Sequence, residues 1–361
     1  VVEKSLQLRE DGYMMDFFGA GYDVAERMGL LPELENIHYP IPYLSFLDRR
    51  GCPRLNVSYA HLRKLFNDRH FNFMRGEFEQ LLYARAKDGV EIRFGTTVEK
   101  IQQHEHNVTV TLSDGSEGTY DLVVGADGIH SGVRSLAFGN EQSFYRYLGY
   151  YAAAFILDEP PAGLQCMNVF STLTVPGRQV GVYPIRAGRL ATFFMHKAKE
   201  RIAVGADIKH LLQQVYGGMD WIVPELLEQC PSSNIYFDEV SQIELPCWSS
   251  GRIVLVGDAC QCVSLIAGQG ASMAVTGAYV LADELRESGD DTGTALIRYE
   301  ARMKPSIEKK QQAGRNMATW FVPDSSLRIA IRNLVMRSVS FPIAGSFLKR
   351  IFAADETITI S

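Results

Sequence analysis

The chain has 361 residues, with 46% hydrophobic and 22% charged side chains, which suits an ordinary globular protein large enough for two domains. A formal net charge of −6 argues against a global basic field that would recruit nucleic acid. No apolar run approaches the roughly 20 residues of a membrane span, and the start lacks a signal-peptide pattern. We therefore expect a cytoplasmic protein.

The six cysteines are too sparse for a disulfide framework in a chain of this length. Cys260 and Cys262 form the only close pair in the sequence, and no histidine cluster accompanies them. Since a four-coordinate metal site needs more ligands, we expect small buried thiols and no metal.

The first half of the chain alternates between helical and strand patterns. Val1–Glu3 looks like the end of a buried strand. After it, the spacing of apolar residues and the turn residues predict a helix over 19–30, paired strands around Arg50–Gly51 within 38–60, a helix over 78–87, and strands over 91–94, 108–112 and 120–125, the last two joined by the Asp114–Gly115 turn.

The second half begins with a block of strand patterns and ends in helices. The predicted elements are strands over 149–157, 179–185 and 190–196, helices over 208–216 and 222–230, a short apolar strand over 252–256, and a long helix over 270–286. Parallel-type strands and helices at both ends, with antiparallel-type strands between, imply a split α/β domain that carries a sheet domain.

The most informative segment runs from Gly251 to Leu285. Its buried strand delivers Asp258 at the carboxyl end, where open α/β sheets bind ligands and where a carboxylate can accept hydrogen bonds from sugar hydroxyls. Gly268-Gln269-Gly270 then opens a helix whose free N–H groups and dipole suit a developing negative charge, such as that of a reduced flavin. A strand, glycine turn and helix of an unrelated α/β protein is the alternative.

A second segment, Tyr120 to Arg134, repeats this design. A strand ends in Asp127-Gly128, and a helix follows with Ser131 as a candidate N-cap. Asp127 can reach a ribose or a water-bridged pyrophosphate, and Arg134 offers either a fork for phosphate or a structural ion pair. A plain Asp-Gly turn is the alternative.

These motifs carry a family resemblance that covers essentially the whole chain. DLVVGADGIHSGVR is similar to the DG motif, and VGDACQCVSLIAGQG to the GD motif, of class A flavoprotein monooxygenases of the para-hydroxybenzoate hydroxylase type. The stretch LREDGYMMDFFGAGYDVAERMGLL resembles the branch of tetracycline-inactivating monooxygenases.

The resemblance implies an FAD/NAD(P)-binding Rossmann-like domain of the glutathione-reductase type, split by an antiparallel-sheet substrate domain and followed by C-terminal helices. We expect the FAD-binding domain over 1–37, 68–145 and 241–300, the substrate domain over 38–67 and 146–240, and the C-terminal helices over 301–361.

The resemblance also implies cofactor contacts for particular residues. Glu3 would hold the adenosine ribose, Asp16 would sit beside the flavin, and Arg75 would contact the cofactor near its ribityl chain. Asp258 would bind a ribityl hydroxyl, and Arg9 matches a position implicated in NADPH binding. Two plainer interpretations stay open, with Arg75 as part of a charged helix start and Arg9 as a solvated loop residue.

The implied activity is hydroxylation of an aromatic or polyketide-like small molecule through a flavin C4a-hydroperoxide, with FAD as cofactor, NADPH or NADH as co-substrate, and O2. Such a protein needs no catalytic triad, because it orients the substrate and excludes water. The alternatives are a non-catalytic FAD-binding remnant and a flavin reductase similar to geranylgeranyl reductases. Trp221, Trp248 and Trp320 do not form the Trp-x-Trp element of flavin-dependent halogenases.

The sequence departs from the family pattern in three places. The Gly-x-Gly-x-x-Gly element expected about 30 residues before Glu3 is absent, so we expect the chain to be a truncated form that lacks this unit. Gln261 replaces the histidine common after Gly-Asp-Ala, and Leu265 replaces a proline near the flavin face.

Two regions stay open at this point. The substrate pocket is expected against the middle strands, with candidates whose facing the sequence does not fix, namely Phe170, Tyr183, Phe193, Phe194, Met195 and His196. The basic amphipathic segment 327–352 can pack across the two domains, which we favour, or lie on a membrane surface.

Overall fold

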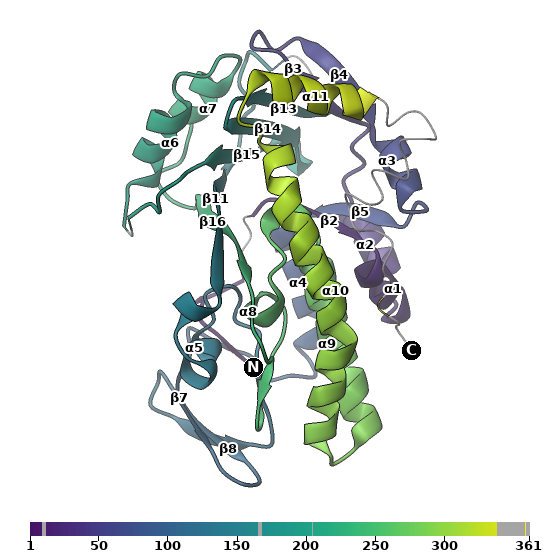
Figure 1. The fold of residues 1–361 in the computed structure, drawn as a ribbon, viewed down its shortest axis with the longest axis vertical. Helices are drawn as coiled ribbons and strands as arrows, with labels where there is room; N and C mark the ends of the chain where they lie inside the picture. Colours follow the sequence, from purple (N-terminus) through teal and green to yellow (C-terminus); the bar gives the residue numbers. More distant parts are fainter. Residues whose placement is uncertain (9–11, 165–167, 204, 338–357, 359–361) are drawn as a thin grey trace.

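A computed structural model describes residues 1–8, 12–164, 168–203, 205–337 and 358. Figure 1 shows an elongated molecule, with the large sheet and α11 at one end and the long helices α9 and α10 running side by side along its length. No helix among the described residues is long and apolar enough to cross a membrane.

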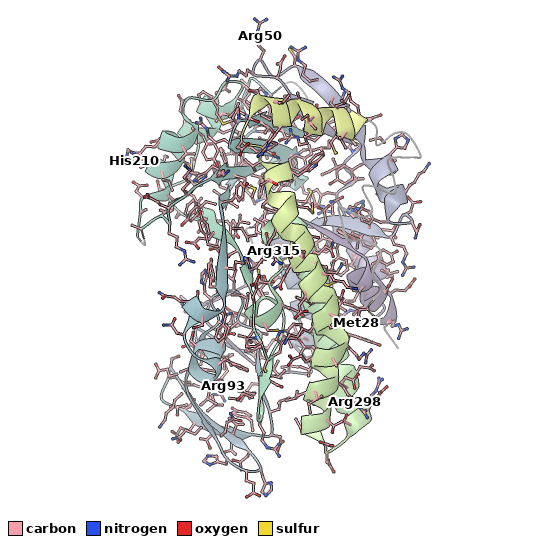
Figure 2. The ribbon with its side chains drawn as sticks, viewed as in Figure 1. Met28, Arg50, Arg93, His210, Arg298 and Arg315 are labelled. Atoms are coloured by element: carbon pink, nitrogen blue, oxygen red, sulfur yellow. The ribbon has the colours of Figure 1, made fainter. Side chains whose placement is uncertain are left out.

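The largest sheet has eight strands in the order β16-β11-β15-β14-β13-β3-β4, with β12 paired to β15. All its pairs are antiparallel except β13 with β3. Its strands are β3 (Tyr43–Leu47), β4 (Pro53–Ser58), β11 (Tyr145–Ala154), β12 (Ile156–Leu157), β13 (Phe170–Val175), β14 (Arg178–Pro184), β15 (Leu190–Lys197) and β16 (Tyr236–Ile243). The hairpin predicted around Arg50–Gly51 is confirmed, and Arg50 lies at its tip (Figure 2).

Short strands from distant parts of the chain form the smaller sheets. β1 (Val2–Glu3) pairs in parallel with β6 (Arg93–Phe94), and β10 (Val123–Gly125) pairs in parallel with β18 (Ile253–Leu255). The remaining strands are β2 (Met14–Phe18), β5 (His70–Met74), β7 (Val98–Gln103), β8 (Val108–Leu112), β9 (Glu117–Tyr120) and β17 (Ser249–Ser250).

The structure confirms the helices that the sequence predicts over 19–30, 78–87, 208–216, 222–230 and 270–286. The helices are α1 (Ala20–Arg27), α2 (Leu31–Ile37), α3 (Tyr59–Leu65), α4 (Arg75–Ala86), α5 (Gly132–Phe138), α6 (Ile208–Tyr216), α7 (Val223–Glu228), α8 (Asp258–Gln261), α9 (Gly270–Ser288), α10 (Thr292–Phe321) and α11 (Ser326–Arg337). The expected domain boundary at residue 300 falls inside α10, and the boundary at 240 falls inside β16.

Two sequence predictions about strands are wrong. The strand expected over 120–125 is two strands in different sheets, so the Asp114–Gly115 turn joins β8 to β9 and not to β10. Apolar residues continue past Tyr120, so the pattern gives no sign that the chain changes sheets there. Val1 was expected in a buried strand, but its side chain is 74% exposed.

The large sheet is covered on both faces by different partners. One apolar cluster joins sheet residues such as Val180 and Phe194 to Leu212 of α6 and Leu226 of α7. Another joins Met195 and Val240 to Ile266 and to Met317 of α10. The second face therefore looks toward the loop that precedes α9.

The described part of the basic C-terminal segment packs onto the protein. Arg332 of α11 is 4% exposed; its guanidinium donates to the Phe321 carbonyl and lies 5.0 Å from the Phe46 ring. Leu327, Ile331 and Leu334 stay exposed on the same helix. These contacts favour packing for α11, and residues 338–352 lie outside the described residues, so membrane contact stays a prediction.

Gly21 allows α1 to lie directly against α9. A Cβ atom at Gly21 would sit 2.6 Å from the backbone Cα of Ser272, a distance that side chains do not tolerate. We expect Gly21→Ala to destabilise the fold by roughly 2 kcal/mol, because overpacking a fixed backbone outweighs the helix propensity of alanine.

Gly293 is a matched control, since it is also the second residue of its helix and its Cβ would meet the nearest atom at 3.6 Å. Gly293→Ala should leave the free energy of urea unfolding unchanged or slightly raised, by less than about 1 kcal/mol. Equal losses in the two variants would contradict the close packing of α1 on α9.

Candidate active site

The two Asp-Gly motifs of the sequence meet at one edge of a parallel sheet. β10 and β18 pair with Gly125 opposite Leu255, so Asp127 and Asp258 follow neighbouring strand ends. The carboxyl ends of adjacent parallel strands are where such sheets bind ligands. The structure thus brings together motifs that lie more than a hundred residues apart in sequence.

Arg134 holds these two motifs together. It lies in α5 and is fully buried. Its Nη1 donates to the carbonyl of Ala259 at 2.8 Å, and its Nη2 donates to the carbonyl of Ile129 at 2.6 Å. Burial lowers the pKa of Arg134, although Glu141, 3.6 Å away, opposes this shift. Of the two roles open from the sequence, the structural one is confirmed for Arg134.

Asp127 has a local role in the structure. Its carboxylate accepts hydrogen bonds from the Ser131 hydroxyl and, at 2.9 Å, from the backbone N–H of Val133. The predicted cap is confirmed, because the Ser131 hydroxyl accepts the N–H of Arg134 at 2.9 Å. Asp127 is exposed, so its carboxylate can cap α5 and still face a ligand, while Gly128 has a φ of 80°.

Asp258 and Arg75 form the electrostatic centre of the site. Burial raises the pKa of Asp258, and the nearby positive charge of Arg75 opposes that rise. Arg75 begins α4 and is half-buried, yet no side-chain hydrogen bond or ion pair to its guanidinium occurs in the part of the chain that the structure describes. An arginine left in this state is suited to a polar or anionic ligand.

Two tyrosines that the sequence analysis did not single out line the same centre. The rings of Tyr13 and Tyr236 lie 4.9 Å apart. Burial raises the pKa of Tyr13 to about 12, while Arg75 acts against the rise. Nothing in the sequence marks these positions, because Tyr236 arrives on the edge strand β16, far along the chain.

Asp16 reaches the glycine loop from another direction. It lies on β2, where its Oδ1 accepts hydrogen bonds from Asn72 Nδ2 at 2.5 Å and pairs with His70 Nε2 at 3.0 Å. Its Oδ2 lies 3.7 Å from the position that a Cβ of Gly268 would take. Asp16 and the start of α9 are therefore neighbours.

The glycine loop presents the start of a 19-residue helix. Gly268 adopts the left-handed conformation with φ 63°, and a Cβ at Gly270 would lie 3.9 Å from Asp258 Oδ1. Gln269 is buried, accepts a hydrogen bond from Lys310 Nζ at 2.6 Å, and makes no side-chain cap to the helix. The start of α9 therefore lies beside the carboxylates of Asp258 and Asp16.

One predicted residue, Glu3, does not join this centre. Glu3 ends β1, and its carboxylate accepts the backbone N–H of Ser5 at 2.7 Å. Within the described ranges, no contact links it to Asp16, Arg75 or Asp258. Arg9 lies outside the described residues.

The structure divides the candidate pocket residues between the two faces of β15. Phe193 packs beside Leu265, Tyr236 and Phe321, on the face that looks toward the glycine loop. His196 lies on the opposite face, where its Nδ1 is 3.0 Å from the Tyr216 hydroxyl and burial lowers its pKa to about 4. Phe194 is buried on that face too, among α6 and α7. His196 is therefore structural.

Gln261 and the nearby cysteines belong to the framework of this loop. Gln261 is buried and donates from Nε2 to the carbonyl of Met273 at 2.9 Å. Cys260 and Cys262 are buried free thiols, as predicted. No group of metal-ligating side chains occurs among the described residues.

These features fit a flavin nucleotide. The unpaired guanidinium of Arg75, the acceptors of Asp258 and Asp16, and the side-chain-free backbone at Gly268 and Gly270 match a ligand that carries phosphates, hydroxyls and a flat ring. The site defines a nucleotide-dependent enzyme of the flavoprotein class.

Comparison with known proteins identifies the family. The family model described as "FAD binding domain" matches residues 59–313. A flavin-dependent monooxygenase from an unknown prokaryotic organism is 31% identical over 87% of this chain and 81% of its own. Another, from Legionella longbeachae serogroup 1 (strain NSW150), is 28% identical over 87% of this chain and 81% of its own.

Solved structures agree. The tetracycline destructase Tet(55) superposes with a TM-score of 0.83 at 27% identity, over 100% of this chain and 91% of its own. Klebsiella pneumoniae HpxO with FAD and uric acid gives a TM-score of 0.80 at 22% identity, over 98% and 90% of the two chains, which supports the fold alone. The chain belongs to the FAD-dependent monooxygenases of class A, and the expected fold class, enzyme class and FAD cofactor are confirmed.

Arg134 generates a prediction about stability. Replacement by methionine removes the donors to the carbonyls of Ala259 and Ile129, so we expect Arg134→Met to cost roughly 2–4 kcal/mol of unfolding free energy. Urea unfolding followed by circular dichroism measures it.

Arg146 provides the control, because its ion pair with Glu244 is exposed and should be worth less than about 1 kcal/mol. If Arg134→Met unfolds at the same urea concentration as Arg146→Met, the two motifs do not depend on Arg134.

Proposed function

We propose that this FAD-dependent monooxygenase hydroxylates an aromatic or polyketide-like small molecule, with NADPH or NADH as the electron donor. The observation that carries the proposal is the arrangement of Asp16, Arg75 and Asp258 around the start of α9, opposite an aromatic face of the large sheet. The net reaction converts substrate, O2, NAD(P)H and a proton into hydroxylated substrate, water and NAD(P)⁺.

The cofactor contacts expected from the sequence become part of this proposal. Arg75 and Asp258 hold the polar chain of FAD, and Asp16 accepts a hydrogen bond beside the flavin. Gly268, Gln269 and Gly270 bring the positive end of α9 to the ring. Asp127 and Gly128 lie at the neighbouring strand end, where Asp127 can reach a ribose or a water-bridged pyrophosphate. The assignments of Glu3 to the adenosine ribose and Arg9 to NADPH rest on the resemblance alone.

Bound FAD supplies electron transfer and oxygen activation, and the protein supplies orientation and shielding. The dipole at the start of α9 stabilises negative charge that develops in its vicinity. Aromatic side chains at the sheet face keep water away from the reacting atoms. The reaction does not require the protein to supply a strong acid or a nucleophile.

The sheet face that looks toward the loop supports the proposed substrate class. Phe193, Tyr236 and Phe321 lie there with Leu265, and Tyr183 stands nearby with Phe170 at a ring distance of 5.2 Å. Such a wall favours a flat, hydrophobic substrate. The similarity to Tet(55), a tetracycline destructase, supports a multi-ring substrate for this chain as well.

We also propose that the large sheet forms a substrate domain made of 38–67 and 146–240, carried by an FAD-binding domain of 1–37, 68–145 and 241–300 and followed by C-terminal helices over 301–361. The hairpin β3–β4 supports this division. Although the hairpin comes early in the chain, β3 pairs with β13 in a sheet whose strands outside the hairpin all lie within residues 145–243. The cytoplasmic location stays a prediction from the sequence.

The function is tested by incubating the FAD-loaded protein with NADPH or NADH and a panel of phenols, polyketides and tetracyclines. We expect substrate-dependent oxidation of the nicotinamide together with a product heavier by one oxygen atom, measured by mass spectrometry with ¹⁸O2. Nicotinamide oxidation without labelled product from any panel member would contradict the proposed substrate class.

Arg75 generates a prediction about cofactor binding. Since hydrogen bonds to charged groups are strong, we expect Arg75→Ala to weaken FAD binding by roughly 10- to 100-fold. Titration of the apoprotein with FAD, followed by quenching of flavin fluorescence, measures the dissociation constant.

Arg85→Ala is the matched control. Arg85 lies on the same helix and carries the same charge, but it pairs with Glu33 at the surface. The Arg85→Ala substitution should alter the FAD dissociation constant by less than about threefold. Equal effects of the two variants would show that Arg75 acts only through the net charge of α4.

A further inference from the structure

A buried histidine stands behind the carboxylate of Asp16. In the antiparallel pair β2–β5, Asp16 is opposite Asn72, and Phe18 is opposite His70. Because side chains two residues apart in a strand share a face, His70 and Asn72 lie on the same face of this pair as Asp16. The two strands thus present one acceptor and two potential donors together.

The contacts are directed at one oxygen atom. His70 Nε2 lies 3.0 Å from Asp16 Oδ1, and Asn72 Nδ2 donates to the same oxygen at 2.5 Å. Oδ2 is the atom that faces Gly268. The side chain of His70 is 4% exposed, whereas that of Asp16 is 42% exposed. The donors therefore hold the carboxylate from the protein side and leave its other oxygen toward the glycine loop.

The surroundings of His70 favour a proton on one ring nitrogen over the other. Its ring lies among three aromatic rings, with centroid distances of 5.7 Å to Phe66, 5.9 Å to Phe18 and 6.0 Å to Tyr59. Its Nδ1 is buried and has no hydrogen-bond partner among the described residues. A proton on Nδ1 would be a buried donor without an acceptor, while a proton on Nε2 is bonded to Asp16. A proton on Nε2 is therefore the arrangement that fits these contacts.

Tyr59 completes the enclosure. Its hydroxyl lies 3.5 Å from Asn72 Nδ2, and burial, followed by the negative charge of Asp16, raises its pKa well above the usual range. The Tyr59 hydroxyl therefore stays protonated, so Asp16 is the anion that the donors of His70 and Asn72 meet.

We propose that His70 is a positioning residue for the flavin site. Its Nε2–H, with the amide of Asn72, fixes the rotamer of Asp16 so that Oδ2 is presented beside Gly268 as an acceptor for an N–H of bound flavin. This inference rests on the proposed contact of Asp16 with the flavin and adds the residue that orients it. A half-exposed carboxylate without these donors would sample several rotamers and bind the flavin less well.

Two substitutions at His70 separate positioning from packing. His70→Leu removes the donor and keeps an apolar side chain. His70→Gln keeps a donor, because its amide nitrogen can occupy the place of Nε2. We expect the FAD dissociation constant to rise by roughly tenfold in His70→Leu and by less than about threefold in His70→Gln. Thermal unfolding of each apoprotein checks that it is folded.

The double variant tests the route through Asp16. Asp16→Ala should weaken FAD binding by a similar factor, and His70→Leu in the Asp16→Ala background should cause no further loss, since both changes remove the same interaction. The visible absorption band of bound flavin should shift in the same direction in both single variants. In the apoprotein, ¹⁵N chemical shifts of labelled histidine should identify His70 as the Nε2–H tautomer near neutral pH.

Phe66→Leu is the control for packing, because it loosens the same aromatic enclosure without touching the hydrogen bond. It should lower the melting temperature and alter the FAD dissociation constant by less than about threefold.

Three results would overturn the proposal: an Nδ1–H tautomer, additive losses in the double variant, or FAD binding weakened as much by Phe66→Leu as by His70→Leu. If Asp16→Ala leaves the dissociation constant and the flavin spectrum unchanged, the proposed contact of Asp16 with the flavin fails, and this inference fails with it. If Asp16→Ala weakens binding and His70→Leu does not, the role of Asp16 stands and only the role of His70 is refuted.

Discussion

The site depends on the parallel pairing of β10 with β18 and on the arginine that closes it. Each strand is only three residues long, so the pair has little stability of its own. Arg134 adds a connection from α5 to the carbonyl of Ala259, directly after Asp258. Because the guanidinium is buried and bonded to main-chain atoms, it fixes the backbone of both motifs. The positions of Asp127 and Asp258, and of the loop that follows Asp258, are consequences of this junction.

Helix α9 connects this junction to the rest of the molecule through its packing contacts. Three contacts hold its first turn. Gly21 of α1 packs against Ser272, and the Ser272 hydroxyl accepts a hydrogen bond from the N–H of Phe18 at 3.2 Å. The Met273 carbonyl accepts a hydrogen bond from Gln261 Nε2. On its other side α10 runs alongside, and Arg315 in the last third of α10 (Figure 2) donates to Gln242 of β16 at 3.0 Å. The helix start is therefore held rigidly between the strand ends and the large sheet, as a site that must orient a ligand requires.

Several charged groups of the site are not fully paired by other described residues of the protein. Burial raises the pKa of Asp258. The charge of Arg75 has no hydrogen-bonded partner in the described chain, and one carboxylate oxygen of Asp16 faces the glycine loop. By contrast, the buried carboxylates of Asp283 and Glu284 are paired with Arg302, at 2.9 Å and 2.7 Å. Unpaired buried groups are costly unless a ligand completes them. The contrast between these regions supports the location of the cofactor independently of the motifs.

The sequence by itself determined the motifs and most helices. Asp258, Gly268 and Gly270 could be found because a strand that ends in Gly-Asp and a glycine that opens a helix are local features, fixed by neighbours in the chain. The sequence did not show that residues 120–125 divide between two sheets, that Arg134 is structural, or that Phe193 and His196 lie on opposite faces of β15. It also gave no sign of the group around Asp16, since His70 and Asn72 reach it only through the pairing of β2 with β5. These features depend on which distant segments become neighbours, and that is decided by burial and strand register in the folded chain, not by local pattern.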